Sequence, residues 1–168
     1  MKKHIISFLF LFMAGFSILS FNSCSEDDGP INEASFIVNT YKGIAIGNSQ
    51  HFSNMPSTST DAIIVESTSE DYSSFSVTFK SEFWGNATFE NVKVIREEEG
   101  YRFEDTEGVF SMPNRTPNAT EVTYKEYPAT LSNSTIILLG NVFNFTIDVN
   151  LGEHAGIYTI NLTNANVN

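Results

Sequence analysis

The stretch FNFTIDVNL, residues 143–151, alternates apolar and polar side chains along its whole length. Successive side chains of a β-strand point to opposite faces, so a period of two predicts a strand with one apolar and one polar face. Residues 75–80 (FSVTFK) and 158–162 (YTINL) repeat the pattern. Residues 31–168 show no helical periodicity of comparable length, and we therefore predict an all-β domain.

Turn residues separate several further runs of this kind. Strands are expected at residues 36–46, 62–67, 74–83, 88–96, 101–105, 109–112, 120–131, 135–149 and 157–163. A charged hairpin at 97–100 (EEEG) and a turn at 132–134 (SNS) are expected to join neighbouring strands. The stretches 50–60 and 113–119 are expected to be long loops, where a rigid scaffold usually carries its function.

Consecutive hairpins favour an up-and-down meander, and a meander must protect its two edge strands. We expect a single antiparallel barrel of about eight strands, in which the last strand pairs with the first. A β-sandwich of two sheets is the alternative. Pro128 lies within an expected strand, where it requires a bulge or a position with no N–H partner.

Three strand segments carry a resemblance to a known family. Residues 41–43 (YKG), 89–94 (FENVKV) and 145–149 (FTIDV) resemble the calycin-like β-barrel domain found in small secreted lipoproteins of Bacteroidota-type gut anaerobes. The likeness in strand order and spacing covers most of residues 36–165. It implies an eight-stranded, lipocalin-like barrel at residues 35–168, in a family without an established activity, and it transfers no functional residue.

The first residues are expected to be an export signal. A basic start (MKKH) precedes an apolar run of fifteen residues, 5–19, which is shorter than the roughly 20 residues that span a bilayer. Residues 21–24 (FNSC) then resemble a lipobox. Cys24 is the only cysteine of the chain and has no disulfide partner. We predict that residues 1–23 are a lipoprotein signal peptide and that Cys24 is acylated.

An acidic segment follows the predicted lipidation site. Ser25, Glu26, Asp27 and Asp28 resemble the surface-export signal of Bacteroidota-type lipoproteins. The resemblance implies an outer-membrane protein that is anchored by lipid and faces the cell exterior. A solvated acidic linker is the alternative interpretation, and in either case residues 24–34 are expected to be a lipidated acidic linker before the domain.

The charge of the chain argues against one class of partner. Its formal net charge is −11, and loss of the two lysines in the signal peptide leaves seven basic and twenty acidic residues, a net of −13. Nucleic acids and anionic headgroups are bound by basic surfaces. We therefore expect no nucleic-acid partner, and the membrane contact is expected through the lipid on Cys24.

No motif of the chain supplies catalytic or metal chemistry. His51 and His154 are about a hundred residues apart, whereas a zinc site usually needs three or four ligands. Ser53 and Asp61 accompany His51 without a recognised nucleophile motif. We predict a protein that is not an enzyme and that has no metal and no cofactor.

Aromatic residues suggest one binding site. Trp84 is expected at the end of a strand, and Tyr72, Phe52 and Met55 are expected in nearby loops. Together they could form an aromatic rim at a barrel mouth that binds a small apolar molecule or a glycan. Two alternatives remain open: Trp84 could plug the barrel as part of the core, or the domain could dock to an envelope or host protein by an outer face.

Overall fold

The computed structural model describes residues 33–114, 122–138, 142–163 and 166–167. The described residues all belong to one compact unit, residues 31–168. The predicted signal peptide, Cys24 and the acidic residues 25–28 lie outside the described residues. Within these residues, no helix is long and apolar enough to cross a membrane.

The described part of the chain contains a short 3-10 helix, η1 (Glu33–Ile37), and thirteen strands. The strands are β1 (Asn39–Gly43), β2 (Ile46–Ser49), β3 (Phe52–Pro56), β4 (Asp61–Ser67), β5 (Phe75–Ser81), β6 (Gly85–Val92), β7 (Val94–Arg96), β8 (Gly100–Phe103), β9 (Thr106–Asn114), β10 (Thr123–Ile137), β11 (Val142–Asn150), β12 (Ile157–Thr163) and β13 (Asn166–Val167). The predicted all-β class is confirmed.

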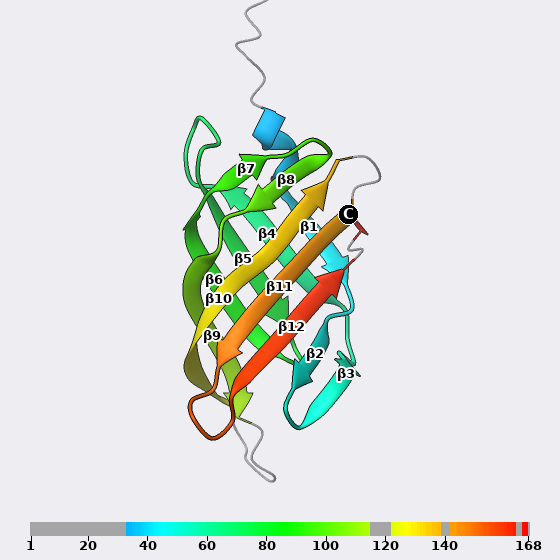
Figure 1. Cartoon of the computed structure of the whole chain (residues 1–168), viewed down its shortest axis with the longest axis vertical. Helices are drawn as coiled ribbons and strands as arrows, with labels where there is room; N and C mark the ends of the chain where they lie inside the picture. Colours follow the sequence, from blue (N-terminus) through cyan, green and yellow to red (C-terminus); the bar gives the residue numbers. More distant parts are fainter. Residues whose placement is uncertain (1–32, 115–121, 139–141, 164–165, 168) are drawn as a thin grey trace, which may run out of the picture. The chain divides into compact units, whose positions relative to one another are not determined.

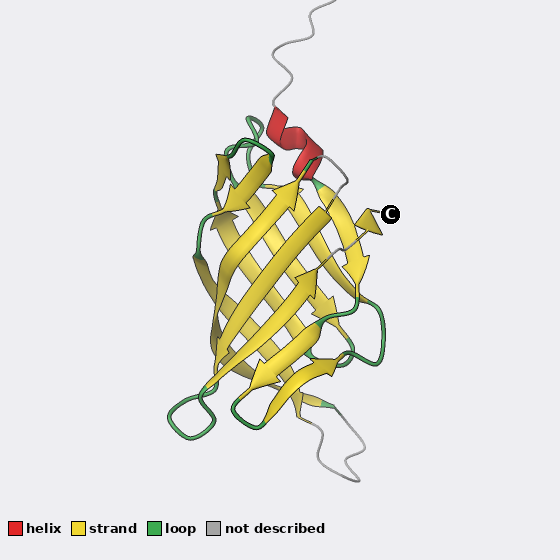
Figure 2. Cartoon of the chain, turned by 45° about the vertical axis from the view of Figure 1, so that its right-hand side comes forward, coloured by secondary structure: helices red, strands yellow, loops and turns green. Residues whose placement is uncertain are grey.

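All strands pair antiparallel in one curled, barrel-like sheet (Figures 1 and 2). Along the sheet the strand order is β13-β1-β4-β5-β6-β9-β10-β11-β12-β2-β3. The remaining strands, β7 and β8, form a hairpin, and β8 pairs with β10. The last two strands pair with the first two: β12 pairs with β2, and β13 pairs with β1. On its other edge, β1 pairs with β4. The last part of the chain therefore lies beside the first.

The expected count of about eight strands is wrong, because several long runs are interrupted. β1 and β2 are separated at Ile44–Ala45, and β3 and β4 at residues 57–60. Lys93 separates β6 from β7, and residues 104–105 separate β8 from β9. The stretch 50–60, expected as a loop, contains β3, which pairs with β2.

The turn expected at residues 132–134 is also wrong: β10 passes straight through it. The β10–β11 ladder changes register between Ser132 and Thr135, and Asn133 takes a positive φ of 46°. The Ser134 hydroxyl donates to the Ser132 carbonyl oxygen at 3.0 Å and accepts from the Thr146 N–H at 3.1 Å. This serine replaces the interrupted ladder bonds, so the segment is a β-bulge.

Phenylalanine side chains fill the interior of the sheet. Seven are less than 2% exposed: Phe75, Phe79, Phe89, Phe103, Phe110, Phe143 and Phe145. Their rings pack in contact, with centroids 5.7 Å apart for Phe143 and Phe145 and 6.3 Å apart for Phe79 and Phe145. Gly108 makes room for this packing, because a Cβ there would lie 2.5 Å from Phe89 Cδ1.

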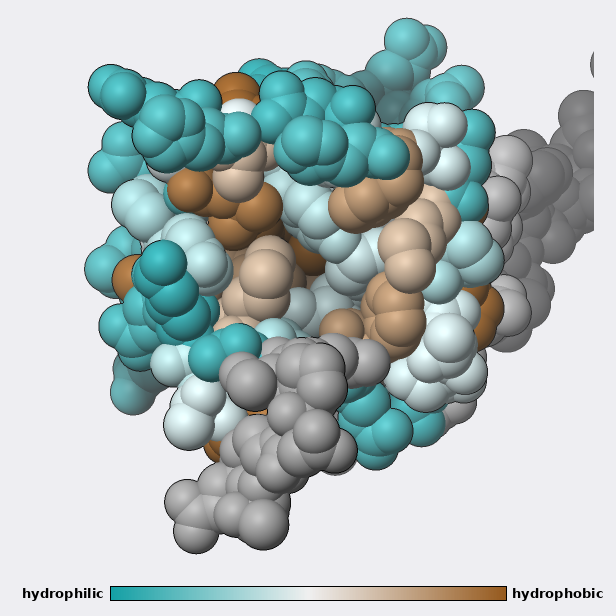
Figure 3. Space-filling model, turned by 90° about the horizontal axis from the view of Figure 1, so that it is seen from below, coloured by the Kyte–Doolittle hydropathy of each residue, from teal (hydrophilic) through white to brown (hydrophobic). Residues whose placement is uncertain are grey.

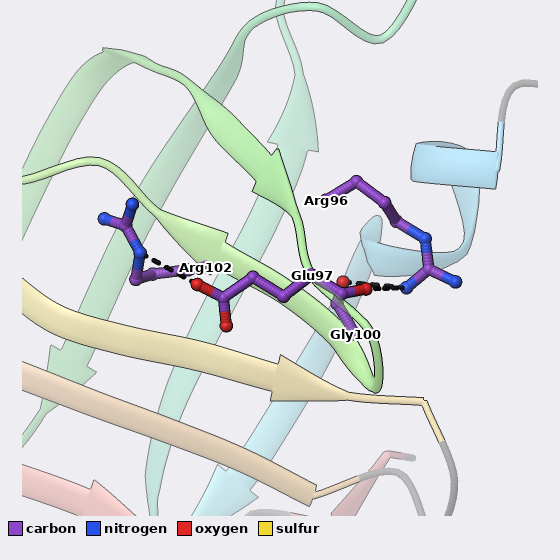
Figure 4. A network of polar contacts seen from close by, with 4 residues as sticks. All are labelled: Arg96, Glu97, Gly100 and Arg102. Carbon is purple, nitrogen blue, oxygen red and sulfur yellow. Dashed lines mark hydrogen bonds and ion pairs between the residues drawn. The ribbon is translucent and has the colours of Figure 1, made fainter.

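The predicted charged hairpin joins β7 to β8 (Figure 4). Arg96 donates from one guanidinium nitrogen to the carbonyl oxygens of Glu97, at 2.9 Å, and Gly100, at 2.8 Å. Arg102 forms an ion pair with the Glu97 carboxylate at 3.0 Å. Since both partners of this pair are exposed, it contributes at most about 1 kcal/mol, and the backbone contacts of Arg96 define the turn.

Tyr41 links η1 to the sheet, and its burial predicts that the folded domain becomes less stable at alkaline pH. Its buried hydroxyl donates to the Ile37 carbonyl oxygen at 3.0 Å, and burial raises its pKa to about 12. An unfolded tyrosine ionises near pH 10. Between these values the unfolded chain loses a proton that the folded chain keeps, so stability present below pH 10 is lost as the pH rises toward 12.

We predict that Tyr41→Phe reduces the loss of folding stability between pH 10 and 12. The shift corresponds to about 3 kcal/mol, so the wild type should lose more free energy of unfolding between pH 9 and 12 than the variant does, as measured by urea denaturation. Tyr124→Phe, at an exposed tyrosine, is the control and should follow the wild type. Parallel curves for Tyr41→Phe and the wild type would contradict the assignment.

Candidate ligand-binding site

Trp84 lies in the tight turn between β5 and β6, where its backbone is fixed by a serine. The Ser81 hydroxyl oxygen accepts from the N–H of Trp84 at 2.9 Å and from the N–H of Phe83 at 3.2 Å. Gly85 follows with a φ of +118°, a conformation that side chains other than hydrogen rarely adopt. The turn therefore holds the two adjacent aromatic residues in a defined position.

The indole of Trp84 covers the break between β1 and β2. Its Nε1 donates to the Ala45 carbonyl oxygen at 3.4 Å, and the side chain is 5% exposed. Gly47 lies under the ring, and a Cβ at this position would be 2.6 Å from Trp84 Cη2. The ring thus fits against the backbone of β2 only because residue 47 has no side chain.

Three further aromatic rings surround Trp84. Phe83 packs edge-on against the indole with centroids 4.5 Å apart, and Tyr158 does so at 5.4 Å. Phe52 lies 6.3 Å from the indole with nearly parallel planes, and 5.2 Å from Tyr158 in an edge-to-face arrangement. The cluster joins the β2–β3 hairpin, the β5–β6 turn and the start of β12.

A hollow of about 410 Å³ opens beside this cluster. Figure 3 shows this end of the domain, where apolar side chains gather in a depression bordered by hydrophilic ones. The lining residues are Phe52, Met55, Phe83, Trp84, Met112, Pro113 and Tyr158. The volume lies within the range of small-molecule sites. Because phenylalanine fills the interior below, the hollow is a feature of the mouth.

The structure brings together three of the four residues predicted for the aromatic rim: Phe52, Met55 and Trp84 line the same hollow. Tyr72 lies elsewhere. It belongs to the turn between β4 and β5, whereas Trp84 belongs to the turn after β5, so the two are at opposite ends of β5. Tyr72 packs partly buried against the core at that other end.

Sequence reasoning missed four lining residues, namely Phe83, Met112, Pro113 and Tyr158. Phe83 could have been found as the neighbour of Trp84. Tyr158 reaches the site because β12 pairs with β2, and the expected pairing of the last strand with the first was the available signal. Met112 and Pro113 come from the end of β9, which extends to Asn114 and so includes the first two residues of the stretch 113–119 that was expected as a loop. The expectation that this loop carries function was the available signal for Pro113.

The described residues that line the hollow are neutral. Among them Tyr158 is the only titratable one, and burial raises the pKa of the Tyr158 hydroxyl well above its usual range. The hydroxyl therefore stays protonated at physiological pH and is available as a hydrogen-bond donor. Across the β9–β10 ladder from Met112, Lys125 holds its ammonium group 5.0 Å from the centre of the Tyr127 ring.

The residues considered for nucleophilic chemistry do not converge. Asp61 is fully buried and accepts from the Ala45 N–H at 2.7 Å and the Ser57 hydroxyl at 3.0 Å. His51 is exposed and lies 3.1 Å from the Gln50 side-chain nitrogen. Across the described part of the chain, no three His, Cys, Asp or Glu side chains are grouped so that they could hold a metal ion.

Comparison with known proteins finds a structural likeness. The chain is similar to a crystal structure from Bacteroides fragilis provisionally described as an outer membrane protein, with a TM-score of 0.53 and 19% sequence identity. The alignment covers 80% of this chain and 46% of that one, so this chain spans less than half of that protein. No protein-family model and no curated protein matches. At this identity the likeness shows the fold alone.

We predict that Gly47→Ala displaces the indole. The new methyl group would overlap Trp84 Cη2, so the ring must move out toward the hollow. Overpacking of this kind costs about 1–3 kcal/mol. Trp84 is the only tryptophan of the chain, so its emission maximum should shift to the red and the unfolding midpoint should fall. An unchanged emission maximum with unchanged stability would contradict the packing described here.

Proposed function

We propose that this protein is a lipid-anchored outer-membrane protein, facing the cell exterior, that binds a small molecule without catalysis. The observation that carries the binding function is the apolar hollow at Trp84. The lining comes from four separate parts of the sheet. Its central residue, Trp84, is held through its backbone N–H by the Ser81 hydroxyl and through its indole by the Ala45 carbonyl oxygen. Such a preformed, mostly apolar concavity is typical of small-molecule sites.

The outer face of the sheet supports attachment by lipid. On β11 the residues that alternate with the buried ones are Asn144, Thr146 and Asp148. The corresponding residues of β5 include Ser76 and Thr78. A sheet that spans a bilayer carries apolar side chains at its lipid-facing positions, whereas these positions are polar. A separate anchor such as an acylated Cys24 suits this domain, and the Bacteroides fragilis neighbour agrees with an outer-membrane location.

We further propose that the fold is of the calycin type. When strands separated only by a short interruption are joined, such as β1 with β2 and β3 with β4, the thirteen strands reduce to eight antiparallel runs. Consecutive runs are joined by hairpins, and the last run lies beside the first. This is the connectivity of an up-and-down barrel.

We predict that Cys24→Ala releases the protein from the membrane fraction. The acyl chains are the proposed attachment, and each buried methylene contributes about 0.8 kcal/mol. Fractionation of cells followed by immunoblotting measures the effect. The matched variant replaces Ser25, Glu26, Asp27 and Asp28 by Ala, and it should stay in the membrane but escape antibody labelling on intact cells. Retention of Cys24→Ala in membranes would contradict lipid anchoring, and unchanged labelling of the matched variant would contradict surface export.

We predict that Met55→Ser weakens ligand binding while leaving the fold intact. Met55 lines the hollow but is 39% exposed, so the substitution should not disturb the core. The processed chain, residues 24–168 with Cys24→Ala, is titrated with N-phenyl-1-naphthylamine and with maltohexaose, and Trp84 emission is followed. At least one probe should change the emission, with about tenfold weaker binding in Met55→Ser.

The matched control for this experiment is Phe36→Ala. Phe36 is 65% exposed on η1, at the end of the domain opposite to the hollow, and its removal should not affect binding. Equal weakening by Phe36→Ala and Met55→Ser would indicate nonspecific adsorption. A response to neither probe would contradict the proposed site.

A further inference from the structure

We infer that the hollow at Trp84 selects flat, neutral, apolar molecules and rejects both anions and sugars. The inference rests on the proposed binding function and names its ligand class. It follows from three properties of the lining: its charge, its hydrogen-bonding capacity and the orientation of its rings.

The charge of the lining is the first property. Within the part of the chain that the structure describes, the seven residues of the lining carry no ionised side chain at neutral pH, because the Tyr158 hydroxyl is protonated. Lys125 lies outside the lining, with its ammonium group over the Tyr127 ring. An anionic group brought into the hollow would lose hydration without gaining a paired cation. The strongly acidic chain, with a net charge of −11, adds repulsion at longer range.

Hydrogen-bonding capacity is the second property. The Trp84 Nε1–H is already donated to the Ala45 carbonyl oxygen, and the thioethers of Met55 and Met112 are weak acceptors. Tyr158 supplies the single hydroxyl of the lining. A sugar would bury several hydroxyl groups against apolar carbon and sulfur, and each would exchange water for no partner. The lining therefore accommodates about one polar atom of a ligand.

The orientation of the rings is the third property. The planes of Phe52 and Trp84 are 19° apart, whereas Tyr158 stands at 71° to Phe52 and 68° to Trp84. Trp84 and Tyr158 are 5% and 8% exposed and form the buried floor of the hollow, whereas Phe52 and Phe83 are only partly buried. A flat ring system can stack on the exposed part of Phe52 or meet Phe83 edge-on, and both geometries are favourable for aromatic pairs. Met55 and Met112 have flexible side chains that adapt to its outline.

The test uses two probes that share one aromatic framework. N-phenyl-1-naphthylamine is neutral, and 8-anilino-1-naphthalenesulfonate carries an added sulfonate. The processed chain with Cys24→Ala is titrated with each probe, and with maltohexaose, while Trp84 emission is followed. The neutral probe should bind at least tenfold more tightly than the anionic one, which corresponds to about 1.4 kcal/mol, and maltohexaose should produce no saturable change.

Two substitutions at Met55 separate charge from general hydrophobicity. Met55→Lys places a cation at the exposed edge of the hollow and should raise the affinity for the sulfonate probe about tenfold while lowering that for the neutral probe. Met55→Gln, of similar length but neutral, should weaken the neutral probe without strengthening the anionic one. Tyr158→Phe should still bind the neutral probe, because stacking provides most of the contact.

The failures of the inference and of the proposed function are distinguishable. The unmodified protein could bind the sulfonate probe as tightly as the neutral probe or more tightly, and lose that binding in Lys125→Gln. This result would overturn the inference that the site rejects anions, but the proposed binding function would stand. Saturable maltohexaose binding that Met55→Ser abolishes would overturn the apolar ligand class in the same way. If no probe alters Trp84 emission, both the inference and the proposed function fail.

Discussion

The packing of phenylalanine rings inside the curled sheet is the constraint on which the rest of the structure depends. Phe79, Phe143 and Phe145 occupy the space that a wider barrel would leave for a ligand, and their neighbours complete the filling. Interiors at this packing density have no room for a guest without displacing side chains. Since these rings leave no interior vacancy among themselves, the proposed binding site lies at an end of the sheet, where packing is incomplete.

At the mouth, a small cluster of polar groups bonds the backbone at the two places where strands are interrupted. The Ala45 N–H donates to the Asp61 carboxylate, and the Ala45 carbonyl oxygen accepts from the N–H of Ser57 at 2.8 Å and from the Trp84 indole. Asp61 also accepts from the Ser57 hydroxyl. These contacts satisfy the backbone at both interruptions, β1–β2 and β3–β4, where ladder bonds are absent. A buried donor left unpaired would cost about 1–3 kcal/mol.

The same cluster connects the fold to the site. The interruption at Ala45 lets β2 pair with β3 as a hairpin that carries Phe52 and Met55 over the mouth, and the Trp84 indole closes onto the carbonyl oxygen at that point. Gly47 must then lack a side chain, because the ring occupies the space of its Cβ. The apolar hollow therefore forms where the backbone groups of Ala45, which lie at the interruption between β1 and β2, find hydrogen-bond partners outside the strand ladder.

Alternation in the sequence predicted the strands that have one buried face. Residues 143–150 all lie in β11, with Phe143, Phe145, Ile147 and Val149 buried as expected, and the last strands pair with the first. The bulge at Ser132–Thr135 was mistaken for a turn, because serine and asparagine favour both and only the Ser134 hydroxyl's contacts distinguish them. Tyr72 was misplaced because residues close in sequence to Trp84 can lie at the far end of an intervening strand.

The helix η1 and the hollow lie at opposite ends of the described domain (Figure 1). The chain enters the domain at η1, whose Ile37 carbonyl oxygen is held by Tyr41, and the register of β1 with β4 places Asn39 opposite Val65, near the turn that contains Tyr72. Trp84 lies between β5 and β6, and therefore at the other end of β5 from the turn that contains Tyr72. The described part of the chain therefore begins at the end of the sheet away from the hollow. The two ends differ in how they are closed: η1 covers one through the Tyr41 hydroxyl, and the aromatic cluster around Trp84 covers the other, so the apolar side chains left partly exposed gather at the second.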